Sequence, residues 1–278
     1  MTPALVSLVT ALGDDELVLG HRHSEWTGYA PHMEEDVAFS SIAQDEIGHA
    51  AAYYGIVAAL TDDDPDRIAL GRKPRDYRNA VLCERPNRDW AYTLARQWLY
   101  DTADDVRLEV LERSAHPELA ALATKQRREE RYHLLHARTW MERVARGPVE
   151  GRARVVDALT DAWSDALGLF EPVDLEDDAV ECGWLPVPSG ELRVRFLELA
   201  SRALDDLGMP PDVHARGAES AEFVASSSGD LIASDDAPDR GERRAPGLGG
   251  RRGEHSPDFD ALWDEMTATY RAEPGASW

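Results

Sequence analysis

The chain has 278 residues, enough for one large domain or two small ones with a full hydrophobic core. Its 53 acidic residues outnumber the 30 lysines and arginines and give a net charge of −23, which argues against nucleic acid and membrane surfaces as partners. No apolar run approaches the roughly 20 residues of a membrane-spanning helix, and the first 20 residues lack a basic signal-peptide head. We therefore expect a cytoplasmic protein.

The cysteine and lysine contents are both low. Two cysteines, Cys83 and Cys182, are too few for a disulfide framework or a thiolate metal site, so any metal must be held by carboxylates and imidazoles. Only two of the 30 basic residues are lysines, and 29 of the 53 acids are aspartates. This composition predicts a halophilic protein. The alternative is a GC-rich genome, which favours arginine codons but does not account for the excess of acid.

Apolar residues recur at helical spacing along the chain, without the sustained alternation of strands, which predicts an all-α protein. Long helices are expected at about residues 3–26, 32–60, 89–114 and 117–146. Turns separate the first two helices near residues 28–31 and the last two near residues 115–117. Residues 61–66 form an acidic turn, and residues 71–86 form an irregular crossover. Two hairpins joined by a crossover predict a four-helix bundle.

The remainder of the chain adds shorter helices and one segment of different composition. Helices at about residues 153–170 and 189–207 are expected to brace the bundle, and an amphipathic helix at about residues 258–270 is expected to dock back on it. Between them the chain is rich in Gly, Ser, Asp and Ala, which is typical of a flexible loop. We therefore expect a helical domain, a flexible loop and a docking C-terminal helix, at residues 1–213, 214–252 and 253–278.

Two of the long helices each carry a Glu-x-x-His tetrapeptide, Glu46 to His49 and Glu130 to His133. Residues three apart lie on one helical face, so each pair can offer a carboxylate and an imidazole to the same metal. One pair is weak evidence. One pair in the second helix of each hairpin is the ligand layout of ferritin-like di-iron carboxylate bundles, which also requires an acid from each of the other two helices.

Both further acids follow from mirroring the motifs across the predicted turns. Glu46 mirrors to Glu16, which lies in an apolar stretch where an unpaired carboxylate is costly to bury. Glu130 of the second motif mirrors across the turn near residue 116 to about residue 102, which is next to Asp101. Asp105 is the reserve candidate for this acid, with Asp104 behind it. Oxygen and nitrogen donors without thiolate suit two irons, with a manganese–iron pair as the alternative. The predicted metal ligands are Glu16, Glu46, His49, Asp101, Glu130 and His133.

The competing interpretation is that Glu-x-x-His pairs arise by chance on the solvated helices of a chain with 53 acids and 9 histidines. Chance does not explain the shared register of the six residues. Outside this set, Asp45, Glu129, Glu34 and Glu35 are expected to be mostly solvated. Seven histidines are assigned to the surface or to the core, and His136, three residues after His133, is expected to lie behind the ligands: His21, His23, His32, His116, His136, His214 and His255.

Motifs along nearly the whole chain, apart from the predicted loop, match those of a known family. They lie at residues 12–22, 24–31, 95–97 with Asp101, 130–134, 140–143 and in the tail, at 253–256, 265–266 and 274–278. In combination they resemble the C subunits of bacterial phenylacetyl-CoA epoxidase, the multicomponent ring 1,2-epoxidase of phenylacetate degradation.

The resemblance implies a ferritin-like protein that pairs with, and stabilises, a catalytic A subunit. In this family the A subunit binds the CoA ester and epoxidises the ring at a di-iron centre with electrons from a reductase, whereas the C subunits have lost part of the ligand set. The chain departs from that pattern. Glu16, Glu46 and His49 stand where such C subunits have residues that do not bind metal.

Two functional hypotheses therefore stand side by side. The first is a scaffold subunit that stabilises the A subunit. The second is a di-iron carboxylate protein with its own metal site, acting in oxygen activation or as a ferritin-like oxidase. Sequence alone assigns no catalytic residue and leaves open whether this chain is itself an enzyme. It also leaves open whether the arginines between Arg72 and Arg88, or the basic run at residues 125–128, contact the CoA ester or are solvated.

Overall fold

The computed structural model describes residues 2–210, 213 and 247–273, and within these residues the chain forms α-helices and short 3-10 helices with no strand. The predicted all-α class is confirmed: the fold is a ferritin-like helical bundle with additional C-terminal helices. None of the described helices is both long and apolar enough to cross a membrane. The bundle is built from α1 (Thr2–Ser24), α2 (Met33–Thr61), α5 (Trp90–Leu111) and α6 (Pro117–Ala145).

The long helices pack as two hairpins, α1 with α2 and α5 with α6, and α2 also contacts α6. Local sequence sets the ends of the second hairpin: the Asp89 side chain accepts a hydrogen bond from the Tyr92 backbone N–H at the start of α5, and Pro117 occupies the first turn of α6. Gly20 brings α1 close to α2. A Cβ at this position would lie 3.2 Å from Cβ of Glu46, so the bare backbone is what allows the approach.

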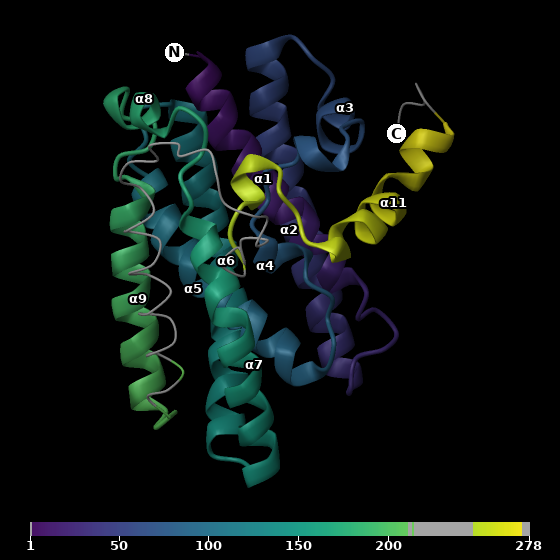
Figure 1. The fold of residues 1–278 in the computed structure, drawn as a ribbon, viewed down its shortest axis with the longest axis vertical. Coiled ribbons are helices and arrows are strands. Elements are labelled where there is room, and N and C mark those ends of the chain that lie inside the picture. The colour runs from purple at the N-terminus through teal and green to yellow at the C-terminus, as the bar shows by residue number, and fades with distance from the viewer. Residues whose placement is uncertain (1, 211–212, 214–246, 274–278) are drawn as a thin grey trace, which may run out of the picture.

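The later helices cover two sides of the bundle (Figure 1). Both α7 (Val149–Leu167) and α9 (Ser189–Asp206) pack on α5, while α11 (Pro257–Ala272), at the yellow end of the chain, contacts α3 (Pro65–Leu70) and α4 (Val81–Glu84). The bundle interior is therefore shielded by elements that lie far from it in sequence.

Short helices occupy segments that were predicted to be irregular. Helix α3 begins inside the predicted acidic turn, because Asp64 caps it and Pro65 starts it. The crossover contains a 3-10 turn, η1 (Pro74–Asp76), followed by α4. A further short helix, α8 (Glu176–Glu181), lies between α7 and α9. These elements span only three to six residues, which is too short for helical periodicity to reveal them.

The predicted flexible loop, residues 214–252, needs a correction at its end. Residues 214–246 lie outside the described residues. Residues 247–252 are packed, however, and include the 3-10 helix η3 (Gly250–Arg252). Gly250 fits so closely against the crossover that a Cβ would lie 2.1 Å from the Asn79 carbonyl oxygen. For these six residues the prediction was wrong, because glycine serves here for close packing and not for flexibility.

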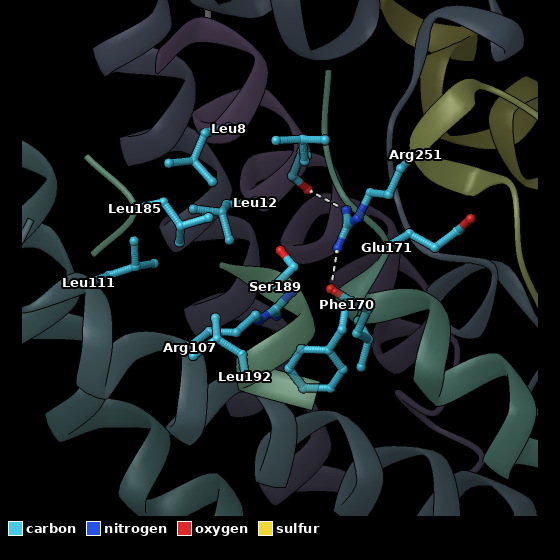
Figure 2. A pocket seen from close by; sticks show the side chains of 13 residues that line it. Leu8, Leu12, Arg107, Leu111, Phe170, Glu171, Leu185, Ser189, Leu192 and Arg251 are labelled. Atoms are coloured by element: carbon cyan, nitrogen blue, oxygen red, sulfur yellow. Dashed lines mark hydrogen bonds between the residues drawn. The ribbon is translucent and has the colours of Figure 1, made fainter. Parts of the chain in front are cut away.

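Arg251 anchors this segment in the interior. It is 3% exposed and points into a pocket with an apolar wall that includes Leu8 and Leu12 (Figure 2). Its guanidinium donates to the Asp15 carboxylate at 2.7 and 2.9 Å, and Arg107 of α5 donates to the same carboxylate at 2.7 Å. Burial opposes ionisation of Asp15, but Arg251 and Arg107 outweigh it and lower the Asp15 pKa. The C-terminal segment thus closes a buried ion-pair network.

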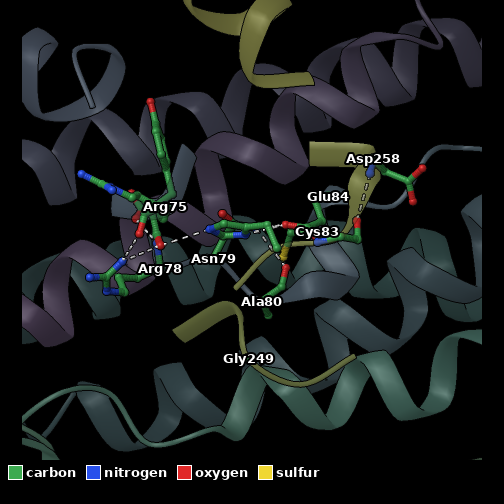
Figure 3. Close-up of polar contacts among 12 residues, drawn as sticks. Arg75, Arg78, Asn79, Ala80, Cys83, Glu84, Gly249 and Asp258 are labelled. Atoms are coloured by element: carbon green, nitrogen blue, oxygen red, sulfur yellow. Dashed lines mark hydrogen bonds and ion pairs between the residues drawn. The ribbon is translucent and has the colours of Figure 1, made fainter. Parts of the chain in front are cut away.

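A second set of polar contacts ties the same segment to the crossover (Figure 3). Asn79 Nδ2 donates to Glu84 Oε2 at 3.0 Å, and the Ser256 backbone N–H donates to Glu84 Oε1 at 2.5 Å. His255 Nδ1 lies 2.8 Å from Glu84 Oε2. Residues that precede and follow the undescribed stretch are therefore parts of one packed structure.

Candidate metal centre

The bundle interior holds a set of carboxyl and imidazole groups contributed by all four long helices. Each member is at most 3% exposed. Glu16 comes from α1, Asp101 from α5, and one Glu-x-x-His pair comes from each of α2 and α6. The structure thus buries every residue predicted as a ligand: Glu16, Glu46, His49, Asp101, Glu130 and His133.

Three of these residues form a compact cluster. Glu16, His49 and Glu130 each offer one donor atom, and these atoms lie within 4.8 Å of one another. His49 Nδ1 is 3.3 Å from Glu16 Oε2 and 3.4 Å from Glu130 Oε1. Tyr100 donates its hydroxyl proton to Glu16 Oε1 at 2.9 Å, which fixes the orientation of that carboxylate. Two carboxylates and one imidazole at this spacing can bind a cation.

Each motif histidine is oriented by a carboxylate from the opposite helix. His49 Nε2 lies 2.9 Å from Glu129 Oε2, and His133 Nε2 lies 3.2 Å from Asp45 Oδ2. With the proton on Nε2, each ring donates outward and leaves Nδ1 directed at the interior, as metal-binding histidines commonly do. The prediction that Asp45 and Glu129 are mostly solvated therefore needs correction. Their side chains are 45% and 37% exposed, yet both contact the site.

The sequence did contain a signal for these two carboxylates. Each stands directly before a motif glutamate, in Asp45–Glu46 and Glu129–Glu130. Because α2 and α6 run antiparallel, the residue before one motif reaches the histidine of the other. Asp45 and Glu129 are each adjacent in sequence to one predicted ligand and in contact with a second predicted ligand on the other helix.

The remaining half of the site contains buried oxygens without hydrogen bonds. Both carboxylate oxygens of Asp101 and the Oε1 atom of Glu46 have no hydrogen-bond partner among the described residues. Burial, with the nearby Glu130 carboxylate, raises the pKa of Asp101, and burial raises that of Glu46, in both cases well above the ordinary value. Unpartnered buried carboxylates are costly, and a cation between them removes that cost. The donor set therefore fits a metal.

The structure also distinguishes between the candidate acids on α5. Asp101 lies close enough to Glu130 and His133 for their charges to act on its pKa, whereas Asp104 pairs with Arg107 at 2.7 Å and Asp105 pairs with Arg127 at 3.2 Å. The last two carboxylates already have cationic partners. Asp101 is thus the α5 residue that lies with the other predicted ligands.

His23 was missed as a residue of this site. It is fully buried, and its Nδ1 atom lies 2.9 Å from Glu46 Oε2. Its position seven residues after Glu16 places it two turns further along the same helical face, which is the signal that could have found it. His136 contacts Glu35 at 2.8 Å and stands edge-on to Phe39, the same ring that packs against His23. Glu35 is largely buried, which corrects the prediction that it is solvated, while Glu34 is exposed as expected.

Most of the candidate CoA-binding arginines already have structural partners. Arg72 pairs with the buried Asp14, and Arg85 pairs with Asp165 at 2.8 Å. Arg127 contacts acids of α5, but Arg128, Arg131 and Arg138 line an open groove on the outer face of α6, together with Tyr132 and Leu135.

Comparison with known proteins places the chain in a family. The model of the phenylacetic acid catabolic protein family matches residues 1–224. This chain belongs to that family. It is 29% identical over 276 residues to the C subunit of 1,2-phenylacetyl-CoA epoxidase from Escherichia coli (strain K12), covering 99% of each chain. It is also 26% identical over 213 residues to the A subunit of the same enzyme, covering 70% of this chain and 68% of that relative. The resemblance inferred from the motifs is confirmed.

Proposed function

We propose that the chain is the C-type subunit of a phenylacetyl-CoA 1,2-epoxidase, in which it pairs with, and stabilises, the catalytic A subunit. The observation that carries this proposal is the match to the E. coli C subunit along 99% of both chains, whereas the match to the A subunit leaves about 30% of each chain uncovered. In this assignment phenylacetyl-CoA is the substrate of the complex, and the reductase serves the A subunit. The complex would act in cytoplasmic phenylacetate catabolism.

Co-expression with the A subunit tests this assignment. The two chains should elute together on size-exclusion chromatography, and the A subunit should be less soluble, and less active with phenylacetyl-CoA and reductase, when this chain is omitted. An A subunit that is equally stable and active alone, with no co-elution, would contradict the proposal. An unrelated acidic helical protein of similar size serves as the control for nonspecific association.

We further propose that this chain binds metal through Glu16, Glu46, His49, Asp101, Glu130 and His133. The specific observation in favour is that both Asp101 oxygens are buried without a partner beside the Glu16–His49–Glu130 cluster. Two irons, or a manganese–iron pair, suit these oxygen and nitrogen donors. Such a centre, when bound, supplies redox chemistry with dioxygen, so the chain would contribute to oxygen activation or act as a ferritin-like oxidase. The monooxygenase complex would then contain a second metal-bearing subunit.

Metal content of a matched pair of variants tests the second proposal. Glu46→Ala removes a predicted ligand, whereas Glu34→Ala removes an exposed acid from the same helix. Asp45 is unsuitable as the control, because it contacts His133. Mass spectrometry of protein purified without the A subunit should find metal in the wild type and in Glu34→Ala, and less in Glu46→Ala. Equal metal content in Glu46→Ala and Glu34→Ala, or no metal in the wild type, would reject the site.

A further inference from the structure

The outward side of α2 and α6 is left open by the rest of the described chain. These two helices contact each other, whereas α7 and α9 pack on α5, and α11 packs on α3 and α4. Between residues 37 and 59 the exposed residues of α2 carry no charge, although 30% of the whole chain is charged. They are Val37, Ser41, Gln44, Ile47, Gly48, Ala51, Gly55 and Ala59. Together with the exposed residues between 125 and 139 of α6, they form a surface that we call the α2–α6 face.

Large apolar side chains gather on the α2–α6 face. Six of the ten that are exposed among the described residues lie on it or at the turn that leads into α2: Tyr29, Met33, Val37, Ile47, Tyr132 and Leu135. Tyr132 and Leu135 are 75% and 61% exposed. Apolar side chains grouped in this way mark interaction surfaces, and a centre without charge is typical of protein interfaces.

Two glycines in the middle of α2 indicate that another chain approaches this face closely. Glycine is less favourable than alanine inside a helix, so it is expected where a Cβ would clash. A Cβ at Gly48 or Gly55 would meet nothing within 4 Å in the described chain outside its own helix. Packing within this chain therefore does not account for the two glycines, whereas a partner helix lying across them does.

The edge of the face beside α5 carries positive charge. Three arginines that line its open groove have no ion pair or side-chain hydrogen bond among the described residues: Arg128, Arg131 and Arg138. The acids of the same groove, Asp105 and Glu112, already pair with Arg127. A surface complementary to this groove therefore carries carboxylates of its own.

We infer that the α2–α6 face is the surface through which this chain binds the A subunit, and that the A subunit places on it a helix with apolar side chains toward α2 and carboxylates toward the three arginines. This inference rests on the proposed function as the C-type subunit. The A subunit of E. coli is 26% identical to this chain over 213 residues, so a helical surface is what such a partner offers. A second copy of this chain fits less well, because a twofold interface matches a patch with itself and would add arginines without supplying acids.

The experiment is a competition for a tagged A subunit that is co-expressed with the wild-type chain and one variant. Intact-mass spectrometry gives the ratio of the two chains in the captured complex, relative to their ratio in the lysate. Leu135→Glu places a charge on the apolar part of the face and should reduce capture by roughly tenfold, as for an interface hot spot. Arg131→Glu should reduce capture by an amount that becomes smaller at high salt. Val194→Glu, on the exposed side of α9, is the matched control and should compete equally with the wild type.

Gly48→Ala and Gly55→Ala separate binding from folding. Alanine favours the helix, so the melting temperature of the chain alone should rise. The added methyl groups should at the same time hold the partner helix away and lower capture by the A subunit. Gly151→Ala in α7 is the matched control, because a Cβ there also meets nothing within 4 Å, and it should leave capture unchanged.

Each of four outcomes would overturn the inference. Equal capture of the wild type, Leu135→Glu and Gly48→Ala would place the A subunit on another surface, while capture of the wild type would still support the assignment as the C-type subunit. Self-association of the chain alone that Leu135→Glu abolishes, with capture unchanged, would assign the face to a second copy. Phenylacetyl-CoA binding by the chain alone that Arg131→Glu abolishes, with capture unchanged, would assign the arginines to the CoA ester. A wild type that is not captured would reject the proposed function together with the inference.

Discussion

Asp15 and Glu16 are adjacent on α1, yet their carboxylates enter two different buried environments. Asp15 receives two guanidinium groups, from Arg107 and Arg251, and both contacts are 2.7 Å or slightly longer. Glu16 faces Tyr100 and His49, and no arginine contacts it among the described residues. The charge of a buried acid with arginine partners is already neutralised, so that acid stabilises the fold. Buried acids that share only histidines and a tyrosine can instead bind a cation.

The comparison extends to the neighbours of each acid. The Asp15 network draws on α1, α5 and the C-terminal segment, and it joins parts of the chain more than 200 residues apart. The predicted metal site draws on the four bundle helices and leaves Asp101 without a partner. The first region should therefore govern the stability of the protein as purified, and the second should govern how that stability responds to metal.

Removal of Arg251 should have the largest effect. Arg251→Ala leaves Asp15 buried with half of its counter-charge, which should reduce the free energy of unfolding by about 3–5 kcal/mol. Arg252→Ala is the neighbouring control. The Arg252 side chain is 52% exposed, and the buried Glu171 carboxylate that it contacts keeps its hydrogen bond from the Gly249 backbone N–H, so the loss of Arg252 should cost less, about 1 kcal/mol. Urea denaturation monitored by circular dichroism measures both. Equal losses in the two variants would show that the Asp15 network is not central to the fold.

Replacing the arginine-paired Asp15 and the unpartnered Asp101 by asparagine should change the stability of the metal-free protein in different directions. Asp15→Asn breaks a paired carboxylate and should destabilise the metal-free protein by about 1–3 kcal/mol. Asp101→Asn removes a buried carboxylate that has no partner and lies among other acids, so the metal-free protein should keep or gain stability. Urea denaturation of the two metal-free variants measures the difference, and a loss in Asp101→Asn as large as that in Asp15→Asn would contradict it.

Metal sharpens the same contrast. Saturating Fe²⁺ should raise the melting temperature of the wild type, since binding at about 100 times the dissociation constant adds about 2.7 kcal/mol. Asp101→Asn should lose most of this gain, and Asp15→Asn should retain it. Differential scanning calorimetry with and without Fe²⁺, under anaerobic conditions, measures the effect. An equal rise in melting temperature with Fe²⁺ in the two variants would contradict the claim that Asp101 belongs to a metal site and Asp15 does not.

Salt should have the smallest effect, and it acts on the surface instead of either buried region. If the charge of −23 is a halophilic adaptation, repulsion between surface acids destabilises the fold when the Debye length grows from about 3 Å at 1 M to about 30 Å at 0.01 M. The melting temperature should therefore rise with potassium chloride in the wild type and by the same amount in Arg251→Ala. A melting temperature that does not change with salt would favour codon bias as the reason for the composition.

The predictions from sequence were accurate wherever helical periodicity carried the information. The predicted bundle helices begin and end within three residues of the observed bounds, as for residues 89–114 against Trp90–Leu111. Mirroring across a turn found Glu16 and Asp101 because residues opposite each other in an antiparallel hairpin are equally distant from its turn. Both acids could be located without coordinates, since the argument requires only the helix repeat and the position of two turns.

The residues that sequence reasoning missed are those whose contacts cross between hairpins or between distant segments. Asp45 and Glu129 precede the motif glutamates and His23 shares a helical face with Glu16, but their contacts appear only when α1, α2 and α6 are placed side by side. Arg251 lies in a glycine-rich run that is typical of flexible loops, yet it enters the interior and pairs with Asp15.

Sequence by itself thus determined the helical class, the two hairpins, the family and the register of six buried residues predicted as ligands, because all of these follow from local periodicity or from motifs. Only the tertiary structure decided which buried acids have arginine partners, which carboxylates orient the histidines, and that His23 holds Glu46. Those relations depend on the distance between side chains on different helices, and that distance is set by packing, such as the close approach of α1 to α2 at Gly20, which no local pattern encodes.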